Sequence, residues 1–224
     1  MEKATREKIS YIWRIIFMII SWSNLLLMLF VRIFVLETEG SLFVAIIRPY
    51  RHYTIQTNLI VSIWFTISVI LQKKPEKYKK INGFLKGVIM IYITITFLIY
   101  AIFLDGLYTP DSWHSWIVDV STHYIVPIAF IIGWVMDIGE KYDWISLLFG
   151  LTYPILYIIF ALVHGTITGN YLYPFFNIRT IGMGGFFIWF FILLGIYLIL
   201  GSITVGINRI IWNKREDRSL RNVD

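Results

Sequence analysis

Six apolar stretches, each of about twenty residues or more, account for most of the sequence. They cover approximately residues 11–36, 53–71, 81–104, 115–135, 144–164 and 182–212. A helix of about 20 apolar residues is long enough to cross the roughly 30 Å of hydrocarbon in a bilayer. The pattern therefore predicts an all-α integral membrane protein, a bundle of six transmembrane helices within a single polytopic membrane domain covering residues 1–224.

The composition supports a chain that is surrounded by lipid. Hydrophobic residues make up 58% of the sequence and charged residues 15%, whereas a soluble domain has about half and about a quarter. There are no cysteines, which excludes a disulfide framework, a thiolate zinc site and a cysteine nucleophile. The sequence also lacks a glycine-rich phosphate loop, a Gly-x-Ser-x-Gly elbow and a His-Glu-x-x-His motif, which argues against nucleotide-driven transport and zinc proteolysis.

The basic residues gather on one side of the predicted spans. Sixteen of the 20 Lys and Arg residues fall on the side that holds both termini, and the other four are Arg32, Arg48, Arg51 and Arg179. By the positive-inside rule we expect both termini in the cytoplasm. The net charge of +6 thus reports orientation, and we expect no nucleic-acid partner. The abundance of Ile and Lys and the short loops favour a prokaryotic cytoplasmic membrane.

A polar stripe runs along the second predicted helix. Thr54, Asn58 and Ser62 recur every four residues, with Thr57 and Thr66 at flanking positions, so these side chains share one side of the helix. Polar groups at membrane depth are costly unless they are paired or face a cavity, and they therefore mark candidate functional sites. The alternative interpretation is hydrogen bonding between neighbouring helices.

The fourth predicted helix carries Asp119 and His123, four residues apart and hence on one face. A carboxylate one turn from an imidazole can fix its tautomer and raise its basicity, as in the base half of a nucleophilic triad. Pro127 lies another four residues on, where it removes a backbone hydrogen bond and favours a kink. The alternatives are an ion pair that packs helices together or a solvated Asp119.

The histidines do not predict a metal site. All four map to the outer half of the predicted spans, but no two have the i, i+4 spacing that is typical of metal ligands. We therefore expect neither a metal ion nor a cofactor.

Three short stretches carry a resemblance to a known family. Residues 53–59 (YTIQTNL), 122–127 (THYIVP) and 171–175 (YLYPF) resemble, in order and rough spacing, the androgen-induced-gene-one family of integral membrane threonine hydrolases. The resemblance covers essentially the whole chain and implies six spans with both ends inside. Animal members hydrolyse fatty acid esters of hydroxy fatty acids. The resemblance places the nucleophile at Thr54 and the histidine at His123.

We therefore expect an intramembrane lipid-ester hydrolase whose partners are the membrane and a fatty acyl ester. Thr54 is the expected nucleophile and His123 the base, with Asp119 as a possible orienter and Thr57 and Asn58 as possible oxyanion donors. Thr57 remains an alternative nucleophile, because residue counting puts it about 24 Å from the cytoplasmic end of its helix, against about 28 Å for Thr54 and about 21 Å for His123. An acyltransferase that uses the same residues and a non-catalytic carrier or scaffold also remain open.

Overall fold

The computed structural model describes residues 3–35, 41–107, 109–138 and 140–221. These described residues form helices and connecting turns, with no β-strand among them. Six of the helices are long and apolar enough to cross a membrane, which confirms the predicted all-α chain with six candidate spans: Thr5–Phe34, Tyr53–Lys73, Leu85–Leu104, Trp113–Met136, Ile145–Thr168 and Ile178–Glu216. Leu36, the predicted end of the first span, lies outside the described residues.

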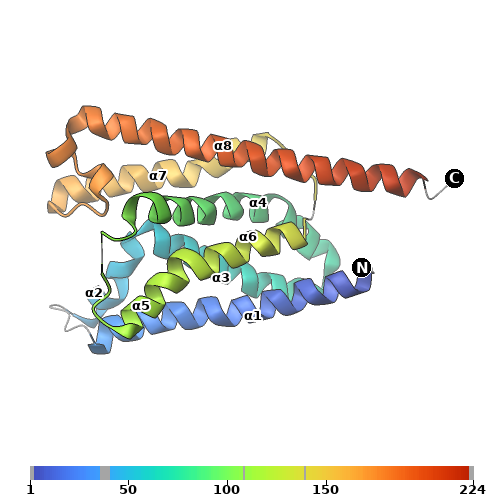
Figure 1. Cartoon of the computed structure of the whole chain (residues 1–224), viewed down its shortest axis with the longest axis horizontal. Coiled ribbons are helices and arrows are strands. Elements are labelled where there is room, and N and C mark those ends of the chain that lie inside the picture. The colour runs from blue at the N-terminus through green and yellow to red at the C-terminus, as the bar shows by residue number, and fades with distance from the viewer. Residues whose placement is uncertain (1–2, 36–40, 108, 139, 222–224) are drawn as a thin grey trace. The chain divides into compact units, whose positions relative to one another are not determined.

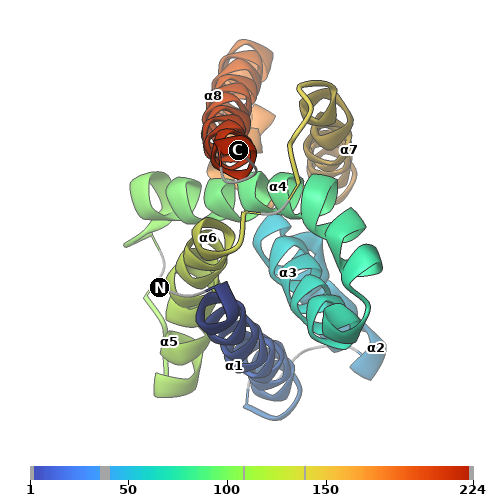
Figure 2. The same cartoon turned by 90° about the vertical axis from the view of Figure 1, so that its right-hand side faces the viewer.

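The chain divides into two compact units, Met1–Glu140 and Lys141–Asp224. In the first unit α1, α3 and α6 run side by side, and α4 packs against α3 and α6 (Figures 1 and 2). Its helices are α1 (Lys3–Phe30), α2 (Leu42–Ile47), α3 (Tyr53–Ile70), α4 (Pro75–Ile99), α5 (Trp113–Val120) and α6 (Val126–Met136).

Three π-helical turns occur among the described residues of the first unit. η1 (Val31–Val35) follows α1, η4 (Tyr100–Leu104) extends α4, and η5 (Ser121–Ile125) joins α5 to α6. The N–H of Val126 donates to the carbonyl of Ser121, five residues earlier, as a π turn requires. The next bond in this register would come from Pro127, which has no N–H. At Pro127, where the sequence predicted a kink, the backbone hydrogen bonding changes from the π-helical to the α-helical pattern.

A packed aromatic and aliphatic core occupies the middle of the first unit. The rings of Trp64 and Phe65 each meet Phe130 edge to face, with centroids 5.1 Å and 5.5 Å apart. Because lipid is as apolar as this core, close packing and interhelical hydrogen bonds hold such helices together more than the exclusion of water does. The core residues are Val61, Trp64, Phe65, Ile89, Ile93, Val126 and Phe130.

The second unit consists of α7 (Ile145–Thr168), the short η6 (Pro174–Phe176) and α8 (Ile178–Arg221). Close packing requires glycine at position 165, because a Cβ there would lie 2.2 Å from the ring of Tyr171. Gly182, with φ of 68°, breaks the helical path near the start of α8.

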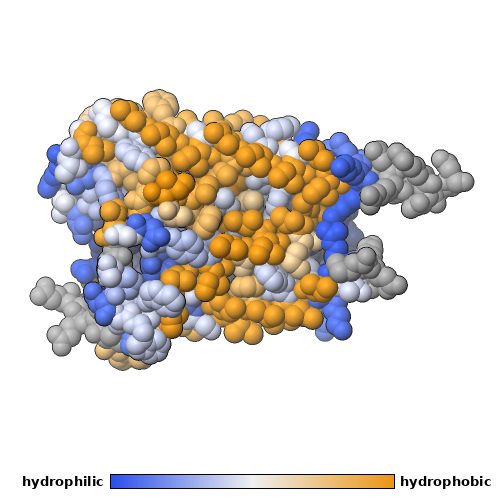
Figure 3. Space-filling model, viewed as in Figure 1, coloured by the Kyte–Doolittle hydropathy of each residue, from blue (hydrophilic) through white to orange (hydrophobic). Residues whose placement is uncertain are grey.

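Large apolar side chains cover the outer faces of the membrane-length helices. Figure 3 shows these side chains along the helices, with hydrophilic ones gathered towards the helix ends. Leu26 on α1 is 63% exposed and Ile188 on α8 is 63% exposed. Exposed side chains of this kind on both units suit contact with lipid.

Candidate active site

Asp119 and His123 are joined by a hydrogen bond on the first unit. Nδ1 of His123 lies 3.0 Å from Oδ1 of Asp119 and 3.0 Å from the backbone carbonyl oxygen of Asp119, because the residue spacing stacks the two residues along α5 and η5. A carboxylate accepts from a protonated Nδ1, so this contact leaves Nε2 as the basic nitrogen of a neutral imidazole. The two side chains are 16% and 18% exposed, so the pair is largely shielded yet remains accessible.

Tyr100 completes this group, and sequence reasoning missed it. Its hydroxyl donates to Oδ2 of Asp119 at 2.5 Å, and its ring stacks on the imidazole of His123 with centroids 3.5 Å apart and planes 7° apart. Tyr100 lies in η4, and no periodic pattern relates it to Asp119, since the two belong to different helices. We call Tyr100, Asp119 and His123 the His123 cluster.

The polar stripe of α3 begins near the His123 cluster, and its side chains are largely used in hydrogen bonds. Thr57 is 1% exposed, and its hydroxyl lies 2.8 Å from the hydroxyl of Thr96 on α4 and 3.0 Å from the carbonyl of Thr54. Thr54 is only partly buried, and its hydroxyl forms no hydrogen bond with the part of the chain that the structure describes. Of the two threonines, Thr54 therefore has the freer hydroxyl.

Asn58 links the Thr54 segment to the segment that carries His123. Its amide nitrogen donates to the carbonyl of Thr54 at 2.8 Å and to the carbonyl of Thr122 at 3.1 Å. In the π register of η5, the Thr122 carbonyl would accept from residue 127, which is proline. Asn58 supplies the N–H that Pro127 lacks, and the backbones of Thr54 and Thr122 are held within the reach of one amide group.

The structure thus brings Thr54 and His123 onto facing segments without joining them. Within the described residues, no hydrogen bond connects the Thr54 hydroxyl to the imidazole. Asn24 on α1 adds a third helix to the region, because its amide nitrogen donates to the Thr122 hydroxyl at 2.8 Å. The Oδ1 atoms of Asn24 and Asn58 are buried and have no hydrogen-bond partner in the structure. These two oxygens can accept hydrogen bonds from a water molecule.

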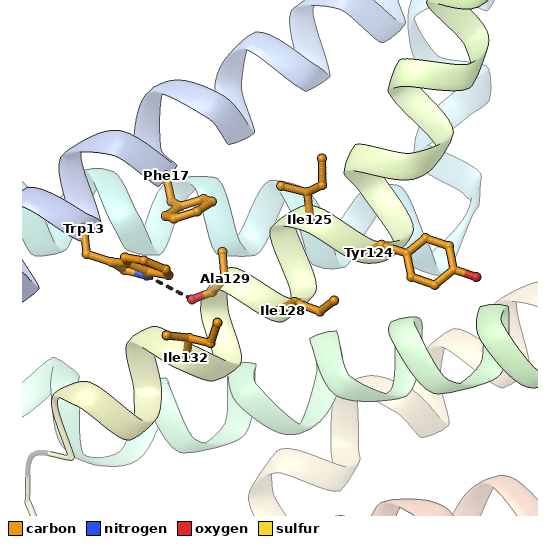
Figure 4. Close-up of a pocket in the computed structure, with 7 residues that line it drawn as sticks. All are labelled: Trp13, Phe17, Tyr124, Ile125, Ile128, Ala129 and Ile132. Atoms are coloured by element: carbon orange, nitrogen blue, oxygen red, sulfur yellow. Dashed lines mark hydrogen bonds between the residues drawn. The ribbon is translucent and has the colours of Figure 1, made fainter.

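An apolar groove of about 280 Å³ lies between α1 and the segment formed by η5 and α6, and one of its lining residues, Tyr124, contacts the ring of Tyr100. Figure 4 shows Trp13 and Phe17 of α1 on one side and the side chains of η5 and α6 on the other. Trp13 of α1 donates from Nε1 to the carbonyl of Ala129 of α6 at 3.0 Å (Figure 4). Tyr124, at one end of the groove, directly follows His123. The remaining lining residues are Ile125, Ile128 and Ile132.

A second polar group lies on the other side of the aromatic core, on α1 and α4 and just beyond the ends of α3 and α6. Arg14 and Lys86 are 5% and 1% exposed, although both belong to the sixteen basic residues that the sequence analysis assigned to the side of the termini. Nζ of Lys86 donates to the carbonyl of Asp137 at 2.6 Å and lies 3.5 Å from Oδ2 of Asp137. The Tyr78 hydroxyl donates to the same carboxylate. We call Arg14, Tyr78, Lys86 and Asp137 the Lys86 cluster.

Charge and hydrogen bonding keep Asp137 ionised. Burial alone opposes ionisation, but the charge of Lys86, the hydrogen bond from Tyr78 and the charge of Arg14 hold the pKa of Asp137 below its usual value. The Arg14 guanidinium donates to Oε1 of Gln72 at 2.6 Å and lies 4.5 Å from the centre of the Tyr78 ring. These contacts tie four helices together.

No group of three or more His, Asp or Glu side chains that could hold a metal ion occurs among the residues that the structure describes. Comparisons with family models, with curated proteins and with solved structures find no match to this chain.

Proposed function

We propose that the chain is an intramembrane lipid-ester hydrolase with Thr54 as nucleophile and His123 as general base. The observation that carries the proposal is the hydrogen bond from His123 Nδ1 to Asp119, which leaves Nε2 free to take a proton. The resemblance to the androgen-induced-gene-one family supports the choice of Thr54, and the Asn58 bridge supports its nearness to His123.

The reaction proceeds in two acyl-transfer steps. Nε2 of His123 takes the proton of the Thr54 hydroxyl as Oγ1 attacks the ester carbonyl, and the imidazolium then protonates the departing alcohol. Water then attacks the acyl-threonine and gives a proton to Nε2, and the imidazolium returns this proton to Oγ1 of Thr54 as the ester bond breaks, which releases the fatty acid and restores the free hydroxyl. Asp119 stabilises the imidazolium in both steps.

The oxyanion of each step requires hydrogen-bond donors, for which Thr57 and Asn58 are the nearest candidates on α3. Both N–H groups of the Asn58 amide are donated to carbonyls in the structure. An oxyanion would therefore compete with the Thr54 carbonyl for one of these bonds.

A lipid substrate and a cytoplasmic position of both termini complete the proposal. The apolar groove between α1 and α6 would hold an acyl chain within the bilayer, since its lining is hydrophobic and includes Tyr124, the residue that follows His123. The distribution of basic residues, 16 of the 20 on one side, supports termini in the cytoplasm, and the abundance of Ile and Lys supports a prokaryotic membrane.

Labelling with a fluorophosphonate probe tests the proposal on the purified full-length protein. The wild type becomes labelled at Thr54, and Thr54→Val and His123→Gln lose the label. Thr94→Val is the matched control, because the Thr94 hydroxyl is buried and donates only to Met90 on its own helix. Label on Thr57 that is lost in Thr57→Val would move the nucleophile to that residue. Full labelling of folded Thr54→Val and His123→Gln would refute the Thr54 and His123 pair.

A non-catalytic carrier or scaffold is a second candidate, favoured by the hydrogen bonding of the α3 stripe. Trp22 of α1 donates to the Thr66 hydroxyl at 2.9 Å, and Thr57 pairs with Thr96 of α4, as a purely packing role requires. This function predicts no probe labelling of the folded wild type. An acyltransferase would be labelled like the hydrolase, and transfer of the acyl group to an added lipid alcohol distinguishes it.

A further inference from the structure

Tyr100 contacts both members of the Asp119 and His123 pair. Its hydroxyl donates to one carboxylate oxygen of Asp119, while the other oxygen of Asp119 accepts from His123. Its ring lies flat against the imidazole at 3.5 Å. Three side chains from two separate segments, η4 and α5 with η5, thus form a closed set of contacts.

Each contact restricts a different motion. The hydrogen bond fixes the carboxylate plane, so that Oδ1 stays directed at Nδ1 of His123. The stacked ring limits rotation of the imidazole about its last side-chain bond, which fixes the direction of Nε2. The same ring face lowers the energy of an imidazolium, since aromatic faces attract cations.

We propose that Tyr100 is a positioning residue that orients the His123 base and governs the pH range in which that base works. The inference rests on the proposed hydrolase function. Asp119 and Tyr100 are the titratable side chains whose direct contacts with the His123 imidazole the structure shows among the described residues. Tyr124 stands beside Tyr100, with ring centroids 5.7 Å apart, and donates to Asp105 at 2.8 Å.

Two substitutions separate the two contacts. Tyr100→Phe keeps the ring and removes the hydroxyl, and Tyr100→Leu removes both. Without the hydroxyl, the negative charge of Asp119 acts more strongly on the imidazole, so protonation of His123 becomes easier. The pH at which fluorophosphonate labelling is half-maximal should rise by about half a unit or more in Tyr100→Phe, and the plateau rate should fall about tenfold. Tyr100→Leu should lower the plateau rate about 100-fold.

The matched control is Tyr197→Phe in the second unit. Tyr197 is 1% exposed, against 6% for Tyr100, and its hydroxyl also donates a single hydrogen bond, to the carbonyl of Leu147. Loss of this buried hydroxyl should leave both the midpoint and the plateau rate at the wild-type values.

A second readout does not depend on hydrolase activity. Modification of His123 by diethyl pyrocarbonate, followed by mass spectrometry across pH, reports the fraction of neutral imidazole, with His164 as the internal reference. In Tyr100→Phe the midpoint for His123 should rise while that for His164 stays constant. If the wild type takes no probe label but this shift occurs, the hydrolase proposal fails and the positioning role of Tyr100 stands. If folded Tyr100→Phe keeps the wild-type midpoint for His123, the positioning role is wrong.

Discussion

The His123 cluster and the Lys86 cluster lie on opposite sides of one aromatic core, and they use their polar groups differently. In the Lys86 cluster both cations are almost fully buried and every charged side chain has hydrogen-bond partners. In the His123 cluster the side chains of His123 and Asp119 are 16% and 18% exposed, and Nε2 of His123 has no hydrogen bond within the described residues. Polar groups with all their partners stabilise a fold, whereas a basic nitrogen without a partner can take part in a reaction.

The largest expected effect comes from breaking the Lys86 cluster. Asp137→Asn leaves Lys86 buried without a counter-charge, so the free energy of unfolding should fall by about 3 to 5 kcal/mol. Unfolding in mixed detergent micelles measures the change. Asp143→Asn is the control, because its carboxylate is 75% exposed and 3.5 Å from Arg209, and such pairs contribute about 1 kcal/mol or less. Equal losses in the two variants would contradict a special role for the buried pair.

At His123 we expect a large loss of probe labelling and a small loss of stability, the opposite of what we expect for Asp137→Asn. His123→Gln should lower probe labelling at least about 100-fold, because the general base is lost, while the free energy of unfolding changes by about 1 kcal/mol or less. Labelling rate per folded molecule and unfolding, measured on one preparation, give both values. Asp137→Asn should keep the wild-type labelling rate per folded molecule. A loss of stability in His123→Gln as large as that in Asp137→Asn would remove the distinction between the clusters.

A smaller effect is expected at the Asn58 bridge. Asn58→Leu leaves the buried Thr122 carbonyl without a donor, so the free energy of unfolding should fall by about 1 to 3 kcal/mol. Pro127→Ala restores a backbone N–H in the π register, and the double variant should recover part of the loss. Ser62→Ala serves as the control, since the Ser62 hydroxyl donates only within α3. If Pro127→Ala gives no recovery, the bridge does not replace the missing N–H.

The smallest effect is the pH dependence of the Lys86 cluster. Because the pKa of Asp137 is lower in the folded protein, its ionised form stabilises the fold at neutral pH, and this contribution disappears as the pH falls through the lowered pKa. Unfolding measured from neutral pH to below about pH 4 should show a steeper loss in the wild type than in Asp137→Asn. Parallel curves would show that Asp137 does not contribute.

The sequence predicted those parts of the site that lie on one helix. The four-residue spacing of Asp119 and His123 indicated their contact, and the spacing of Thr54 and Asn58 indicated a shared face, because helical geometry fixes which side chains stack. Tyr100 and the Lys86 pairing with Asp137 were missed. Each joins residues of different helices, and the position of one helix against another depends on packing that periodicity does not encode.

Hydrophobicity by itself determined that this chain forms six membrane-length helices, since backbone groups in lipid must bond within their own segment. This requirement applies to each apolar stretch by itself, so the six helices can be predicted without knowledge of any tertiary contact. Only the tertiary structure decided which polar side chains use their hydrogen bonds to hold helices together and which keep a donor or acceptor atom without a partner. That difference depends on partners supplied by other helices. Tyr100 stacks on His123, and Asn58 donates to the Thr122 carbonyl, which Pro127 cannot do because it has no N–H.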